Sequence, residues 1–167
     1  QKVCVRAFFM VEWVKYRRSR EGGAALSGRG QRFLFAAYLT AVAALLFCRP
    51  CNDGTGYVGR MAWSLVPLSS IRGYLWLLRH RAGTWMWRYA AAQLFGNLAL
   101  FAPFGWLAPG VFPGMRKPWR FLWRTALLIF LLETAQLLTL RGTFDVDDWI
   151  LNLLGALAGW CLRRVTG

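Results

Sequence analysis

Four long apolar runs alternate with polar and basic connections along this chain. The runs cover residues 33–48, 89–109, 121–140 and 146–162. About 20 predominantly apolar residues are enough for an α-helix to cross the ~30 Å hydrocarbon core of a bilayer. The first run is slightly short and spans only if the long side chains of Arg32 and Arg49 at its two ends extend toward the membrane surface. The pattern therefore predicts four membrane-spanning helices.

The long connection between the first and second runs, residues 49–88, has a pattern of its own. A turn-like Asn52-Asp53-Gly54 precedes a mixed apolar stretch that contains Trp63, Tyr74 and Trp76. Aromatic residues concentrate where a membrane meets water. We expect part of this connection to lie as a segment in the membrane interface.

The composition supports a membrane protein and excludes two other classes. Of the 167 residues, 57% are hydrophobic and only 17% are charged, which is too apolar for a disordered chain or an ordinary soluble domain. The 21 basic residues outnumber the 7 acidic ones, but they flank apolar runs instead of forming one face for nucleic acid. We predict an all-α membrane protein with a basic tail over 1–32 and a bundle of about four transmembrane helices over 33–167, and no nucleic-acid partner.

Basic residues are unevenly divided between the two sides of this predicted bundle. The tail, the connection between the second and third runs together with Arg124 just beyond it, and the C-terminus carry 14 of the 21, whereas the other two connections carry 7. Cytoplasmic connections are enriched in Lys and Arg. We therefore expect a multi-pass protein of the bacterial cytoplasmic membrane with both termini in the cytoplasm, and residues 133–148 toward the outer face.

Two of the apolar runs contain polar residues that a bilayer disfavours. Glu133 and Gln136 lie three residues apart, on one face of the third helix, with Glu133 about 10 Å inside the end of its run. In the second run Asn97 precedes Pro103, which removes a backbone hydrogen-bond donor. We expect a second helix broken at Pro103, with Asn97 facing the interior of the bundle.

An acidic turn leads into the fourth run. Positions 145, 148, 152, 155 and 159 step by three and four, so they share one face of a helix. The residues on this face are Asp145, Asp148, Asn152, Gly155 and Gly159. Asp147 points elsewhere. The Gly-x-x-x-Gly spacing would let another helix approach closely, although it is also frequent by chance.

Together these polar side chains predict a functional site near one membrane face. We assign Asp148 as a general base or nucleophile, Glu133 as a proton carrier and Arg141 as a clamp for a lipid phosphate. The predicted substrate-binding residues are Asn97, Gln136, Asp145 and Asn152. Three acids could instead hold a divalent ion, but no His accompanies them to bind a transition metal, so no metal site is predicted. No glycine-rich nucleotide motif indicates a cofactor.

A purely structural explanation stays open. An ion pair from Arg141 to Glu133 or Asp148 would lock the third helix to the fourth without any reaction. More acids than bases converge here, however, and a lock does not require them.

Three segments of the chain resemble the VanZ-like family of small bacterial membrane proteins. They are GNLALFAPFGWLAP from Gly96, ETAQ from Glu133, and RGTFDVDDWILNLLGALAG from Arg141. The resemblance covers about residues 33 to 165, and the ordered combination is more specific than any one segment. It implies a role in the cell envelope and a link to resistance against the glycopeptide teicoplanin.

The resemblance and the polar residues agree on where a site lies but leave its activity open. One hypothesis is a site that binds and modifies the head group of a membrane lipid or a lipid-linked envelope precursor. The other is a non-catalytic membrane binder that shields an envelope target. A transporter is a weaker third idea, because four spans without an inverted repeat would need at least a dimer. The small-residue face of the fourth helix allows such a homodimer.

Overall fold

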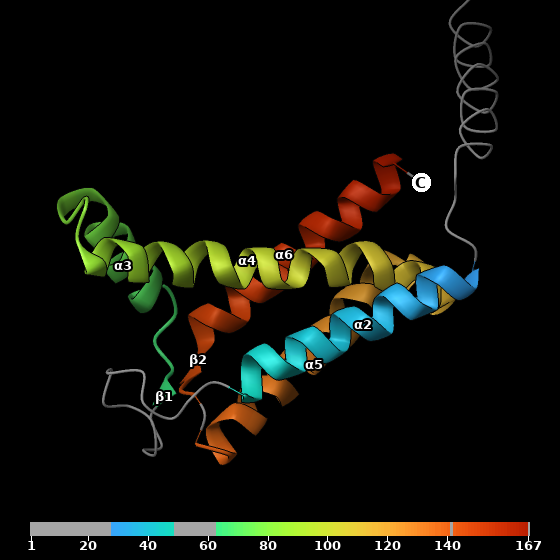
Figure 1. Cartoon of the computed structure of the whole chain (residues 1–167), viewed down its shortest axis with the longest axis horizontal. Helices are drawn as coiled ribbons and strands as arrows, with labels where there is room; N and C mark the ends of the chain where they lie inside the picture. The colour runs from blue at the N-terminus through green and yellow to red at the C-terminus, as the bar shows by residue number, and fades with distance from the viewer. Residues whose placement is uncertain (1–27, 49–62, 141, 167) are drawn as a thin grey trace, which may run out of the picture.

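The computed structural model describes residues 28–48, 63–140 and 142–166, and these are almost entirely helical. Four long helices run through it: α2 (Gly28–Phe47), α4 (Trp85–Val111), α5 (Pro118–Leu138) and α6 (Val146–Thr166). The shorter elements are α3 (Ser69–His80) and the 3₁₀ helix η1 (Pro113–Arg116). Two strands of two residues each, β1 (Trp63–Ser64) and β2 (Phe144–Asp145), pair in parallel. Figure 1 shows α3 beside the start of α4, close to the end where α6 begins.

Each long helix covers most of a predicted apolar run but differs from it at the ends. By length and composition, α2, α4 and α5 are long and apolar enough to cross a membrane. The chain is therefore a multi-pass membrane protein. α6 falls outside that group among the described residues, because Asp147 and Asp148 begin it and Arg163 and Arg164 end it. The prediction of four spans is thus supported for three, and the tail over 1–27 lies outside the described residues.

The predicted break in the second span is wrong. α4 is one uninterrupted helix from Trp85 to Val111 with Pro103 and Pro109 inside it. Contacts on both sides support the helix around Pro103. The Tyr38 hydroxyl of α2 donates to the Leu100 carbonyl at 2.7 Å, and α6 lies against the opposite backbone. Pro103 removes the backbone hydrogen bond to the Ala99 carbonyl, and packing by α2 and α6 on both sides holds the helix in one piece.

Glycines allow the backbones of α4 and α6 to touch. A Cβ atom added at Gly155 would lie 2.1 Å from the Leu98 carbonyl oxygen, and one at Gly159 would lie 1.9 Å from that of Ala102. Both distances are far inside van der Waals contact, so neither position accepts a side chain without moving a helix. The Gly-x-x-x-Gly spacing of the fourth run therefore packs α6 against α4.

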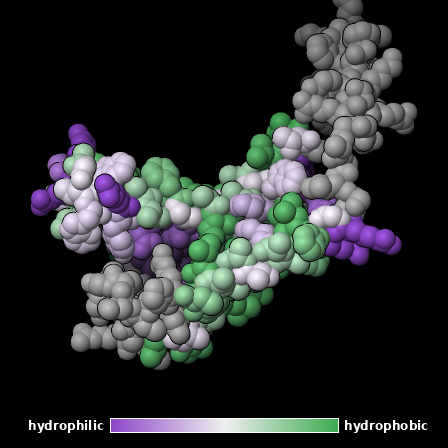
Figure 2. All heavy atoms as spheres, viewed as in Figure 1, coloured by the Kyte–Doolittle hydropathy of each residue, from purple (hydrophilic) through white to green (hydrophobic). Residues whose placement is uncertain are grey.

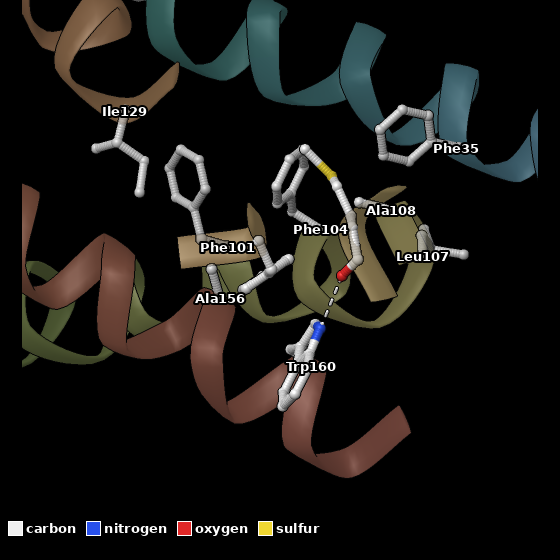
Figure 3. Packing of buried hydrophobic residues seen from close by; sticks show 10 residues of the cluster. Phe35, Phe101, Phe104, Leu107, Ala108, Ile129, Ala156 and Trp160 are labelled. Atoms are coloured by element: carbon white, nitrogen blue, oxygen red, sulfur yellow. Dashed lines mark hydrogen bonds between the residues drawn. The ribbon is translucent and has the colours of Figure 1, made fainter. Parts of the chain in front are cut away.

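Aromatic side chains fill the space between α2, α4 and α6 beside this backbone contact. Figure 3 shows Phe101 and Phe104 of α4 lying between Phe35 of α2 and Ala156 of α6. The Trp160 indole stacks on Phe121 with ring centroids 5.8 Å apart. Its N–H donates to the Met115 carbonyl at 3.0 Å, which ties α6 to η1.

The start of α2 and the end of α6 meet at one end of the molecule. The Arg163 guanidinium donates to the Trp106 carbonyl at 2.6 Å. The Gln31 amide lies against it, and with its oxygen turned toward Arg163 it accepts two N–H bonds, of 2.8 and 3.1 Å. The described residues near this end include many basic ones and no acid: Arg29, Arg32, Arg116, Lys117, Arg120, Arg124, Arg163 and Arg164. Figure 2 shows hydrophilic surface at the two ends of the molecule and mostly hydrophobic surface between them.

Candidate functional site

The acidic residues lie at the opposite end, where α6 begins beside α4. The Asn97 side-chain amide of α4 donates to one oxygen of Asp148 at 2.5 Å. Asp148 lies in the first turn of α6, and Asn97 lies one residue before the backbone contact at Leu98. The close approach of the two helices therefore brings this amide and this carboxylate together, and Asn97 faces the interior as predicted.

A second amide–carboxylate pair joins α6 to α5. The Asn152 side-chain nitrogen donates to Glu133 at 3.3 Å, and both side chains are buried, 4% and 5% exposed. Glu133 also interacts electrostatically with Asp148 and Asp145, which places the three carboxyl groups near one another. Asp148 and Asn152 lie one helical turn apart, so the two amide–carboxylate pairs form one cluster.

Asp145 lies just before α6, at the end of β2, and caps this helix. Its side chain accepts a hydrogen bond from the Asp147 backbone N–H at 2.9 Å, the bond that an N-cap residue makes to the second helical position. Its other oxygen accepts from the Ser70 hydroxyl of α3 at 2.5 Å. Asp145 therefore belongs to the acidic cluster, as predicted, but it is the residue before the helix and not the first member of its polar face.

Asp147 holds the start of α3. Its carboxylate is fully buried and accepts three hydrogen bonds from backbone N–H groups: Leu68 at 2.5 Å, Ser70 at 2.7 Å and Ile71 at 3.0 Å. The N–H groups of a first helical turn have no partner within their own helix, and a negative charge there is also favourable. Here a residue of α6 supplies the cap for α3. Neither Asp147 nor Ser70 is among the predicted site residues.

Two tyrosines extend the cluster onto α3 and α4. The rings of Tyr74 and Tyr89 meet edge to face with centroids 6.0 Å apart, and the Gln93 amide donates to the Tyr89 hydroxyl at 3.1 Å. Burial raises the pKa of Tyr74 well above its ordinary value of 10.0, and the neighbouring Tyr89 and Asp148 raise it further. Tyr74 therefore stays a neutral hydrogen-bonding phenol beside the carboxylates.

Two predicted site residues are not joined to the cluster by a described contact. Gln136 is half-buried and lies beside Gly142, and within the described ranges it makes no polar contact with Glu133. Arg141 lies outside the described residues, and so does the predicted ion pair from it to Glu133 or Asp148. Among residues 28–48, 63–140 and 142–166, no three acidic, His or Cys side chains are grouped closely enough to hold a metal ion.

The four carboxylates differ in how much of their hydrogen-bond acceptor capacity is unused. The described hydrogen bonds of the Asp145 and Asp147 side chains either cap α6 or connect α3 to its start. Asp148 and Glu133 each receive one described bond, from Asn97 and Asn152. Since a carboxylate has two acceptor oxygens, each of these two retains capacity for a ligand. The structure therefore separates a scaffolding pair of acids from a pair that is available for binding or for proton transfer.

Fold and site together define a multi-pass α-helical membrane protein with an acid–amide cluster at one end of its helices. A model of the VanZ/LLP1 family matches residues 35–166, most of the chain, so this protein belongs to the VanZ/LLP1 family. No curated protein and no solved structure matches it.

Proposed function

We propose that this protein crosses the cytoplasmic membrane four times and binds the polar head group of a membrane lipid or lipid-linked envelope precursor at its acid–amide cluster. In this proposal α6 is the fourth span. It starts at the acidic end and finishes beside the start of α2, where Arg163 meets Gln31. The basic end then faces the cytoplasm, as the positive-inside rule favours, and the acidic end faces outward with α3 in the interface.

The observation that carries this proposal is the Asn97–Asp148 pair. Ionisable side chains within membrane helices are costly and usually mark a functional site. Asn97 fixes one oxygen of Asp148, which directs the other toward a ligand, and Asp148 is half-buried. We assign Asp148 as the general base or nucleophile and Glu133 as the residue that carries a proton from the reacting group.

The proposal is tested by comparing lipids and lipid-linked wall precursors from cells that express wild type or Asp148→Asn at equal membrane levels. General acid–base assistance contributes about 10²- to 10⁴-fold, so an enzyme should lose its product almost completely. Thr134→Val is a matched control, since it removes only a hydroxyl bonded within α5 to Phe130. A product made equally by wild type and Asp148→Asn would remove Asp148 from the site.

A second function is favoured by one observation. Two of the four acids hold α3 and the start of α6 in place, which suits a rigid binder as well as an enzyme. In that case the protein shields an envelope target without altering it. The family's association with teicoplanin resistance would then follow from the fraction of the target that the protein occupies. Glycopeptide susceptibility should then rise gradually across weakened variants and scale with expression, and lipid profiles should stay identical.

A further inference from the structure

Three side chains of the cluster, Glu133, Asp148 and Asn152, have unused hydrogen-bond acceptor capacity. Asp148 and Glu133 each have acceptor capacity beyond the bond from Asn97 or Asn152. The side-chain oxygen of Asn152 is buried and has no hydrogen-bond partner among the described residues. Its orientation is fixed, because the nitrogen of the same amide donates to Glu133.

A buried acceptor of this kind requires a donor. More than nine in ten buried polar groups in proteins are hydrogen-bonded, and an unsatisfied one costs about 1–3 kcal/mol. Asn152 is only 4% exposed, and its amide lies against one of the two available carboxylates. No ion pair joins Glu133 or Asp148 to a basic side chain within the described part of the chain. Among the described residues, the Asn152 oxygen thus has no hydrogen-bond donor, and neither carboxylate has an ion-pair partner.

We infer that the lipid head group carries an ammonium group, which Glu133, Asp148 and the Asn152 oxygen receive together. This inference rests on the proposed function and names its substrate class. A primary ammonium has three N–H donors and one positive charge, which suits three acceptors of which two are acidic. A divalent metal ion fits less well, since no three acids of the described residues are close enough to one another to hold one. A phosphate or other anion would be repelled at this position.

The test uses the full chain in nanodiscs of phosphatidylglycerol that contain a few per cent of a second lipid. That lipid is phosphatidylethanolamine or its N-acetylated form, which keeps the phosphate, adds only an acetyl group and lacks the ammonium charge. The measurement is the amount of each lipid that stays bound on native mass spectrometry. We expect roughly tenfold or greater preference for phosphatidylethanolamine, because hydrogen bonds between charged partners are the strong ones.

Variants locate that preference at the cluster. Glu133→Gln and Asn152→Leu should each bring the ratio of the two lipids toward one. Thr125→Val is the matched control: Thr125 also has a buried hydroxyl without a described partner, and it lies two turns before Glu133 on the same face of α5. That variant should keep the wild-type ratio. The wild-type ratio needs no variant, so a misfolded mutant does not affect the main result.

The outcomes separate this inference from the function on which it rests. If both lipids are retained equally and more than phosphatidylglycerol, and both are lost in Asp148→Asn, the inference of an ammonium group is refuted but the proposed head-group site stands. Retention of neither lipid would overturn both. If soluble glycerophosphoethanolamine displaces the bound lipid completely, the ammonium inference is supported, and a soluble amine is a sufficient ligand. If the lipid stays bound in its presence, the ammonium that the site receives is that of a lipid.

Discussion

Substitution of Asp147 tests whether a residue of α6 holds α3 in place. One oxygen of its carboxylate accepts from Ser70 and Ile71, and the other accepts from Leu68. In Asp147→Asn the amide oxygen can keep the first two bonds, but the amide nitrogen then faces the Leu68 N–H, donor against donor. Leu68 also has left-handed backbone geometry, with φ of 64°, which costs a residue with a side chain about 1–2 kcal/mol. Its conformation therefore depends on being held.

The magnitude follows from the kinds of bond that change. A hydrogen bond to a charged group contributes about 2 kcal/mol and a neutral one about 1. Two bonds lose their charge and one is lost, which gives about 4 kcal/mol. Since Leu68 is exposed and its N–H regains water when α3 detaches, we expect about 3 kcal/mol, or roughly a 100-fold rise in the opening of α3.

Hydrogen exchange followed by mass spectrometry measures this opening directly. The amides of α3 from Arg72 onward should exchange faster, whereas those in the middle of α4 should not change, because local segments open independently of the core. Asp148→Asn is the matched control, since it removes the same charge from the adjacent residue, whose described bond is to Asn97 and not to α3. Unchanged exchange of α3 in Asp147→Asn, or an equal effect of both variants, would refute the capping role.

Three further predictions address packing, ionisation and topology. Gly155→Ala should destabilise the protein by about 3 kcal/mol in a denaturation assay in detergent, because the added Cβ would collide with a carbonyl of α4. The control is Gly96→Ala, which should be neutral or slightly stabilising because an added Cβ there meets nothing within 4 Å. Folding raises the pKa of Tyr74, so its neutral phenol helps to hold α3 at every pH up to its ordinary pKa of 10.0, and that contribution is lost as the pH rises further. The absorbance of wild type minus that of Tyr74→Phe should therefore show no Tyr74 phenolate at about pH 11 until the protein unfolds. In a background without native cysteines, a membrane-impermeant maleimide should label Arg81→Cys but not Lys117→Cys on intact cells, and the reverse result would invert the proposed orientation.

The helices were predictable from the sequence because lipid imposes a strong local rule. Uncharged runs of about 20 residues stand out between basic flanks, and three of the four predicted spans correspond to helices that are apolar and long enough to cross. The error at Pro103 has a physical origin. The effect of a proline on helix geometry depends on its neighbours in space, here Tyr38 and the backbone of α6, and the sequence does not display them.

The candidate site was predictable only where helical periodicity applies. The spacing of Asp148 and Asn152 indicated a shared face, and the structure joins them to Asn97 and Glu133. The role of Asp147 was missed because its partners are backbone N–H groups, which every residue except proline carries and which leave no trace in the sequence. The two-residue strands β1 and β2, which bring α3 to α6, are likewise too short to show alternation.

Packing and chemistry are coupled at the contact between α4 and α6. The two helices run in the same direction from the acidic end, so the register of one on the other decides which side chains meet there. Gly155 fixes that register by admitting the Leu98 carbonyl, and the adjacent Asn97 then reaches Asp148. A side chain at Gly155 would push α4 away by more than an ångström, whereas hydrogen bonds weaken steeply over smaller displacements. The small residues of α6 are therefore part of the site, because the pairing of Asn97 with Asp148 depends on the approach of two backbones and not on the two polar residues alone.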